Sequence, residues 1–428
     1  MVLNYIWIGF FLVGFLVALF RVLGYYFRDF FLEQFNFIFT VADRDVFSAI
    51  VQSTFDMAKT SVEISIYLIG VMTLWLGIMK IGERGGAVGA LSRIMNPLFS
   101  RIFPGIPNNH PAMGSILMNF SANMLGLDNA ATPLGLKAMK ELQEINTDTS
   151  KASNAQIMFL VLNTSSLTLI PVSVLAMRVA CGAKVPTDVF IPIILATFFS
   201  TLTGLIYVSI RQRINLFNKV ILAYLAGITT FIAGIIFYLS RLPQTMVESR
   251  TAFAGNFILF LVIIVFIVLG IRKKINLYES FIEGAKEGFG VAIKIIPYLV
   301  AMLVAIGVFR ASGSFDFLMN GIGGLVAIFG IDTRFVDALP VAFMKPLSGS
   351  GARGLMVETM NHFGADSFAG RLACIMQGST ETTFYTVAVY YGAVNIRNTR
   401  YTVTGGLLAD LAGVIAAIFI MYLFFGRS

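Results

Sequence analysis

A single carboxylate in the second half of the chain carries the clearest chemical signal. Glu381 is the only charged residue between positions 372 and 394, and Thr380 and Thr382 flank it. A carboxylate in such an apolar run must be protonated, hydrogen-bonded or paired with a cation. We therefore predict that Glu381 binds a solute hydroxyl or amine, coordinates Na⁺ together with hydroxyls, or carries a proton. The alternative is a structural acid paired with Arg353 or Arg371.

Further polar side chains gather in apolar surroundings in both halves of the chain. Such groups are costly in lipid unless they face one another or a solute. We predict that they bind the substrate, and the alternative is a hydrogen-bond network that only joins helices. These residues are Asn119, Ser121, Asn123, Asp128, Asn129 and Thr132 in one segment, Asn163, Ser165 and Ser166 in a second, and Gln377, Ser379, Thr380, Glu381 and Thr382 in a third.

The counterpart of the first segment is a flexible stretch between two cations. Residues 345–353 read Lys-Pro-Leu-Ser-Gly-Ser-Gly-Ala-Arg and add Ser348 and Ser350 to the predicted substrate-binding residues. The Gly-Ser-Gly run could present consecutive backbone amides as an anion nest, and a surface turn is the alternative. Asp410 is a second carboxylate in an apolar run, and we expect it to reach water near a helix end.

Catalytic chemistry has little support. His110 and His362 lie in neither an HExxH motif nor a GxSxG nucleophile elbow, and a hydrolase using Ser379 or Ser350 would lack a base. Two cysteines form no disulfide framework or metal cluster. We expect no enzyme, no cofactor and no metal site.

The elements that position these residues must lie in a membrane. Of 428 residues, 57% are hydrophobic and 13% are charged, about half the charged share of a soluble domain, and the mean hydropathy is +0.82. This composition predicts an all-α polytopic membrane protein and excludes soluble enzymes, nucleic-acid binders and fibrous proteins. The net charge of +8 is a clue to topology, because Lys and Arg favour cytoplasmic loops.

The chain divides into four expected parts. Residues 1–49 form an N-terminal span and connecting segment, 50–215 a first repeat, 216–274 two linking transmembrane helices, and 275–428 a second repeat. Uncharged runs at 189–210, 220–240 and 252–271 predict plain spans. Each repeat reads as an amphipathic stretch (55–59 or 281–286), a short span, a polar hairpin and a broken span, at 157–180 or 372–394, before its last span.

Loop charges predict that the two repeats are inverted. Residues 80–101 carry four basic residues and one acidic residue, whereas the matching residues 310–339 carry two basic and three acidic. The first segment is then cytoplasmic and the second external. Three crossings in each repeat, two linking helices and the N-terminal span give nine crossings, an arrangement common in secondary transporters.

At these motifs the sequence resembles the spore maturation protein A and B families joined in one chain. Residues 119–135 look like the A-family signature in the first repeat, and residues 345–353 with 377–382 look like the B family in the second. Both belong to the gate, or nucleoside-recognition, group, which is similar to parts of concentrative nucleoside transporters and of ferrous iron transport protein B. The resemblance implies a multi-pass bacterial inner-membrane protein with a transporter-like gate fold. The short, interrupted hydrophobic runs themselves predict re-entrant or broken helices. Those transporters carry a Gln-Thr-Glu run at a hairpin tip, of which Gln377, Thr380 and Glu381 look like a looser version.

Two functions are open at this stage. The first is a transporter or channel for a small polar solute, with its site between the repeats and with Na⁺ or H⁺ as the coupling ion. The second is a scaffold for envelope or peptidoglycan proteins, in which the polar residues only join helices. Either protein would contact the lipid bilayer and no nucleic acid, and the sequence leaves a homo-oligomer open.

The inverted arrangement makes a topological prediction. Single cysteines placed in residues 80–101 and in residues 310–339 of a cysteine-free variant should react with a membrane-impermeant reagent from opposite sides, because the two segments differ in charge. Residues 211–219 and 272–274 should share the cytoplasmic side. Labelling of both test segments from one side would refute the inverted repeat.

Overall fold

The structure, a computed structural model, describes residues 2–426, apart from the side chains of residues 2, 3, 128–130, 244, 245 and 248. This part of the chain is helical and contains no strand beyond an isolated bridge between Lys151 and Asn398. The prediction of an all-α polytopic membrane protein is confirmed. Seven helices of the described residues are long and apolar enough to cross a membrane, namely α1, α4, α10, α11, α12, α13 and α19.

The N-terminal segment lies along the second repeat. It consists of α1 (Val2–Tyr26), α2 (Arg28–Phe35) and α3 (Val41–Arg44). The indole nitrogen of Trp7 donates to the carbonyl oxygen of Ala301 at 3.0 Å, and Arg21 Nε pairs with Asp43 at 2.7 Å. The first span predicted from the sequence is therefore a helix packed on the rest of the fold.

Each repeat contains seven α-helices and one short 3-10 helix, which lies at a different position in the two repeats. The first repeat comprises α4 (Val46–Gly85), α5 (Ala87–Ile102), α6 (Pro111–Met124), α7 (Asp128–Glu144), α8 (Asn154–Ser165), α9 (Val172–Ala180), the short η1 (Pro186–Val189) and α10 (Phe190–Gln212). The second comprises α13 (Leu277–Ala311), α14 (Ser314–Ile328), η2 (Val336–Ala338), α15 (Leu339–Met344), α16 (Gly349–Phe363), α17 (Phe368–Ser379), α18 (Thr383–Gly392) and α19 (Thr402–Phe425). Linking helices α11 (Lys219–Ser240) and α12 (Gln244–Arg272) connect them, as expected.

The first helix of each repeat is longer than the sequence suggested. The amphipathic stretch and the short span that we expected at the start of each repeat form one continuous helix. Helix α4 has 40 residues and α13 has 35, which correspond to about 60 and 52 Å at ~1.5 Å per residue. No proline interrupts the polar-to-apolar junction of α4, where Lys59 and Glu63 pair one turn apart at 3.8 Å.

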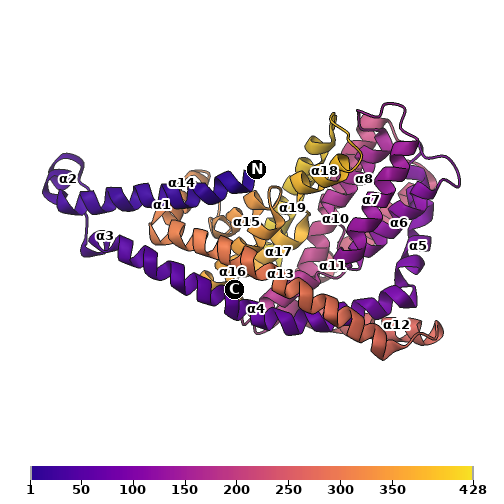
Figure 1. Ribbon diagram of the computed structural model, residues 1–428, viewed down its shortest axis with the longest axis horizontal. Helices are drawn as coiled ribbons and strands as arrows, with labels where there is room; N and C mark the ends of the chain where they lie inside the picture. The colour runs from indigo at the N-terminus through magenta and orange to yellow at the C-terminus, as the bar shows by residue number, and fades with distance from the viewer. Residues whose placement is uncertain (1, 427–428) are drawn as a thin grey trace.

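Helices α4 and α13 run antiparallel and side by side (Figure 1). Gly307 lies beside Met57, whereas Gly288 lies beside Met72, so the two helices run in opposite directions. A Cβ atom built on Gly288 would lie 2.5 Å from the carbonyl oxygen of Met72. Small residues thus allow the two backbones to touch, as in other membrane helix pairs. This antiparallel pairing is the geometry that inverted repeats require, while the side of the membrane on which each repeat opens stays a prediction.

The close crossing makes a testable prediction about stability. Gly288→Ala should lower the unfolding free energy by about 1–3 kcal/mol, because the new methyl group overlaps the α4 backbone. Gly290→Ala is the matched control, since a Cβ there meets no atom within 4 Å. Thermal unfolding of the two purified variants beside the parent protein decides the point. Equal melting temperatures for the two variants would show that the crossing is not tight.

Candidate functional site

Both predicted broken spans are broken at a cluster of hydroxyl residues. Helix α8 ends at Ser165 and α9 begins at Val172, while α17 ends at Ser379 and α18 begins at Thr383. Serine and threonine side chains compete for helix carbonyls: Thr164 Oγ1 donates to the carbonyl of Val161 at 2.9 Å. Ser166 then has a positive φ of 39°, which ends the helix.

A backbone hydrogen bond joins the two breaks. The amide of Glu381 donates to the carbonyl oxygen of Thr164 at 2.8 Å, which joins the second repeat to the first. Each break is also held by the hairpin of its own repeat. The Leu169 amide donates to Met124 at 2.9 Å, and the Phe384 amide donates to Pro346 at 3.0 Å. Backbone that leaves a helix inside a membrane needs such partners or a water-filled cavity.

The hairpins differ from the expectation in one respect. In the first, α6 and α7 meet at a turn where Gly126 has a φ of 73° and a Cβ would lie 2.8 Å from the Ile170 carbonyl oxygen. In the second, the Gly-Ser-Gly run forms the first turn of α16 and not a separate loop, while the anion nest stays a prediction. Ser348 accepts a hydrogen bond from the Gly351 amide at 3.0 Å, so it caps the helix and holds the segment in helical form.

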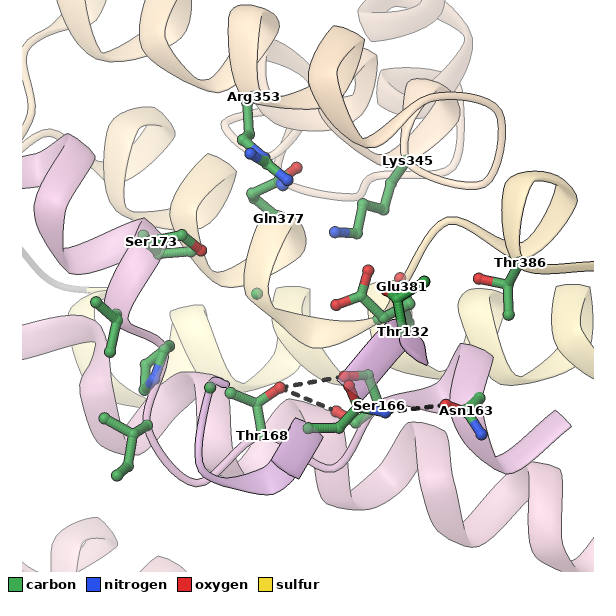
Figure 2. Close-up of a pocket in the computed structure, with 18 of the residues that line it drawn as sticks. Thr132, Asn163, Ser166, Thr168, Ser173, Lys345, Arg353, Gln377, Glu381 and Thr386 are labelled. Atoms are coloured by element: carbon green, nitrogen blue, oxygen red, sulfur yellow. Dashed lines mark hydrogen bonds between the residues drawn. The ribbon is translucent and has the colours of Figure 1, made fainter. Parts of the chain in front are cut away.

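A cavity of about 250 Å³ lies between the two breaks. Polar groups from both repeats point into it, as Figure 2 shows for Thr132 and Thr168 of the first repeat and Lys345 and Glu381 of the second. Asn123 Nδ2 donates to Asn163 Oδ1 at 2.9 Å in its wall. The juxtaposition of Glu381 with the polar residues of the first repeat, which the sequence suggested, is thus present.

The predicted substrate-binding residues divide into three groups. Seven line the cavity: Asn123, Thr132, Asn163, Ser166, Gln377, Thr380 and Glu381. Seven others do not, namely Asn119, Ser121, Ser165, Ser348, Ser350, Ser379 and Thr382. The side chains of Asp128 and Asn129 fall outside the described part of the chain.

Six of the seven that lie elsewhere have local partners, and that of Ser121 Oγ is Met95 Sδ at 3.9 Å. Asn119 Nδ2 donates to the Ala131 carbonyl at 2.7 Å, and the hydroxyls of Ser165 and Ser379 donate to carbonyls of their own helices at 2.9 Å. The hydroxyl of Ser348 caps α16, and the hydroxyl of Ser350 lies 3.2 Å from the hydroxyl of Ser348. These groups support the hairpins and the breaks, which position the residues that face the cavity.

Several lining residues were not predicted to bind substrate. Lys345 and Arg353 drew attention only as the cations that bracket the expected nest. Polar residues Thr168, Ser173, Tyr385, Thr386 and Tyr390 also line the cavity. A signal existed for the last three, because positions 385, 386, 389 and 390 share one face of a helix.

Neither expected arginine neutralises Glu381. Arg371 Nε pairs with Asp188 at 2.8 Å, and Asp188 also accepts from the fully buried Arg178 at 2.8 Å. Among the described residues Glu381 has no ion pair within 4.0 Å, and its side chain is exposed to the cavity. The interpretation of Glu381 as a paired structural acid is therefore wrong for this part of the chain.

Asp410 also departs from its expected surroundings. It is 4% exposed within α19 and does not reach water at a helix end. Thr383 Oγ1 donates to its Oδ2 at 2.6 Å, and its Oδ1 has no partner in the described part of the structure. Gly406, one turn before it, allows Thr383 to approach closely.

A second hollow adjoins the cavity. It measures about 590 Å³ and shares Leu76 and Val291 with the cavity. Charged residues of α4 and α13 line it, and Lys80 lies 3.1 Å from Glu287. Within the described residues, no group of three or more His, Cys, Asp or Glu side chains could hold a metal ion.

Comparisons with known proteins match two segments of this chain. Residues 65–181 and 292–397, together just over half of the chain, match the Gate family, which is described as nucleoside recognition. Spore maturation protein B of Bacillus subtilis (strain 168) is 48% identical over 162 residues, covering 38% of this chain and 89% of that protein. Spore maturation protein A of the same organism is 48% identical over 155 residues, covering 36% and 79%. These matches are consistent with a fusion of the two, and no solved structure gives a significant match.

Proposed function

The chain belongs to the Gate nucleoside-recognition family, and from that premise we propose that it is a transporter, or a transporter-like channel, for a small polar solute. One observation carries this proposal: a cavity lined by polar groups of both repeats lies where the two helices break. Broken helices that meet at such a site are characteristic of secondary transporters. The bacterial inner membrane is the proposed location, and no enzymatic step is part of the proposal.

The surroundings of the cavity suggest how a solute would reach it. The neighbouring hollow between α4 and α13 would serve as a vestibule, with Leu76 and Val291 between it and the cavity. Bound solute would contact both breaks at once, and these are joined by the Glu381–Thr164 backbone bond. A shift of one repeat against the other would then open the site to one side at a time.

An ion gradient would supply the driving energy, with Na⁺ or H⁺ as the coupling ion. Asp410 supports this part of the proposal, because a buried carboxylate with one oxygen unpartnered among the described residues is a costly arrangement unless a cation compensates it. It lies behind the break at Thr383, so its state can influence the shape of the solute site. We propose no nucleic-acid partner; a homo-oligomer is compatible with this scheme.

The proposal is tested by a thermal-shift screen of the purified full chain against nucleosides, dicarboxylates, amino acids and peptidoglycan fragments, with and without Na⁺. One class should raise the melting temperature, since a ligand at 100 times its Kd stabilises by about 2.7 kcal/mol. Glu381→Gln should fold normally and lose this shift, because Gln keeps the shape of the side chain but removes its charge.

Glu63→Gln is the matched control, as Glu63 lies on the exposed surface of α4 outside the cavity. It should keep the full shift. A ligand-induced shift that survives in Glu381→Gln would place the binding site elsewhere. Absence of a shift with every class would favour the scaffold function.

A further inference from the structure

Two opposite charges face the cavity without an ion-pair partner among the described residues. Glu381 enters from the break between α17 and α18, and Arg353 enters from α16 (Figure 2). Neither forms a salt bridge within 4.0 Å in the described part of the chain. A third charged group, Lys345, lines the cavity as well.

A buried side-chain amide, that of Gln377, lines the same cavity as these charges. Gln377 is 5% exposed, and its Oε1 has no hydrogen-bond partner among the described residues. It lies in the last turn of α17, shortly before Glu381, and it lines the same cavity. A buried carbonyl oxygen needs a donor, so this position suits a ligand that carries N–H groups.

The charged side chains of the cavity limit the class of solute that can pair with both Glu381 and Arg353. A neutral nucleoside would supply no counter-charge to Glu381 or to Arg353. A dicarboxylate could pair with Arg353, but Glu381 would repel it. A zwitterion satisfies both signs at once, because a carboxylate can accept two parallel N–H bonds from an arginine and an ammonium can donate to a carboxylate and an amide oxygen.

The size of the cavity also favours a small solute. Its 250 Å³ lies below the range of about 300–1,000 Å³ that is usual for drug-sized ligands. Hydroxyl and amide side chains make up much of the remaining polar wall, and these suit the small polar body of an amino acid or a short peptide.

From these observations we infer that the cavity binds a zwitterion of amino-acid size, with its ammonium at Glu381 and its carboxylate at Arg353. This inference rests on the proposed transport function and narrows the class of its substrate. The two ends of the ligand then bridge the break at residue 381 and helix α16 of the hairpin. Arg353 and Glu381 determine specificity in this arrangement, each for one charge of the solute.

The test measures the affinity of the full-length protein for free amino acids and for analogues that lack one charge. N-acetyl amino acids remove the ammonium, and amino-acid amides remove the carboxylate. The parent protein should bind the best zwitterion at least tenfold more tightly than either analogue. Glu381→Gln should lose the preference over the N-acetyl analogue, and Arg353→Gln should lose the preference over the amide.

Controls separate this inference from the proposed function. Arg353→Lys should retain part of the preference for a carboxylate, and Glu63→Gln should behave as the parent. Binding of a nucleoside but of no zwitterion would overturn the inference and leave the transport proposal standing, whereas absence of binding by every class would overturn both. If Arg353→Gln does not fold, the affinities of the parent protein for the amino acid, its N-acetyl analogue and its amide test the inference. Equal affinities for all three would contradict it.

Discussion

The organisation of the molecule depends on how backbone groups are satisfied where two helices break inside the membrane. An amide or carbonyl without a partner in hydrocarbon costs several kcal/mol, so a broken helix survives only with protein or water around it. Here the amide of Glu381 bonds to the carbonyl of Thr164, and each break bonds to the hairpin of its own repeat. The same constraint that brings the breaks together also creates the polar cavity between them.

Long-range packing makes this meeting possible. Helices α4 and α13 are each longer than the ~30 Å hydrocarbon core and cross backbone to backbone at Gly288, so they bring the two repeats into one body. At the far end of the broken helices, the fully buried Arg178 of the first repeat pairs with Asp366 of the second at 3.1 Å. The cavity therefore lies between two structural connections, and motion of one repeat against the other must act on both.

The sequence predicts the helical class, the plain spans and the two breaks, because lipid imposes a strong rule on polar residues in apolar runs. It predicts less well which polar side chain faces the solute. Ser165 and Ser379 have the composition of site residues, yet each hydroxyl bonds a carbonyl of its own helix. The Gly-Ser-Gly run has the composition of a loop, but the Ser348 cap makes it helical. Arg353 enters the site only because α16 begins where it does, a consequence of tertiary structure that local composition does not contain.

We propose that the two breaks enclose a site through which a charged, polar solute crosses the membrane. Uptake of a mixture of labelled amino acids into proteoliposomes that contain the full chain tests it most directly, with a Na⁺ gradient and a pH gradient imposed separately. We expect the parent protein to show uptake above that of empty liposomes under at least one gradient. The Glu381→Gln variant should lose this uptake at equal protein incorporation. Equal uptake by the parent protein, the Glu381→Gln variant and empty liposomes would contradict the account.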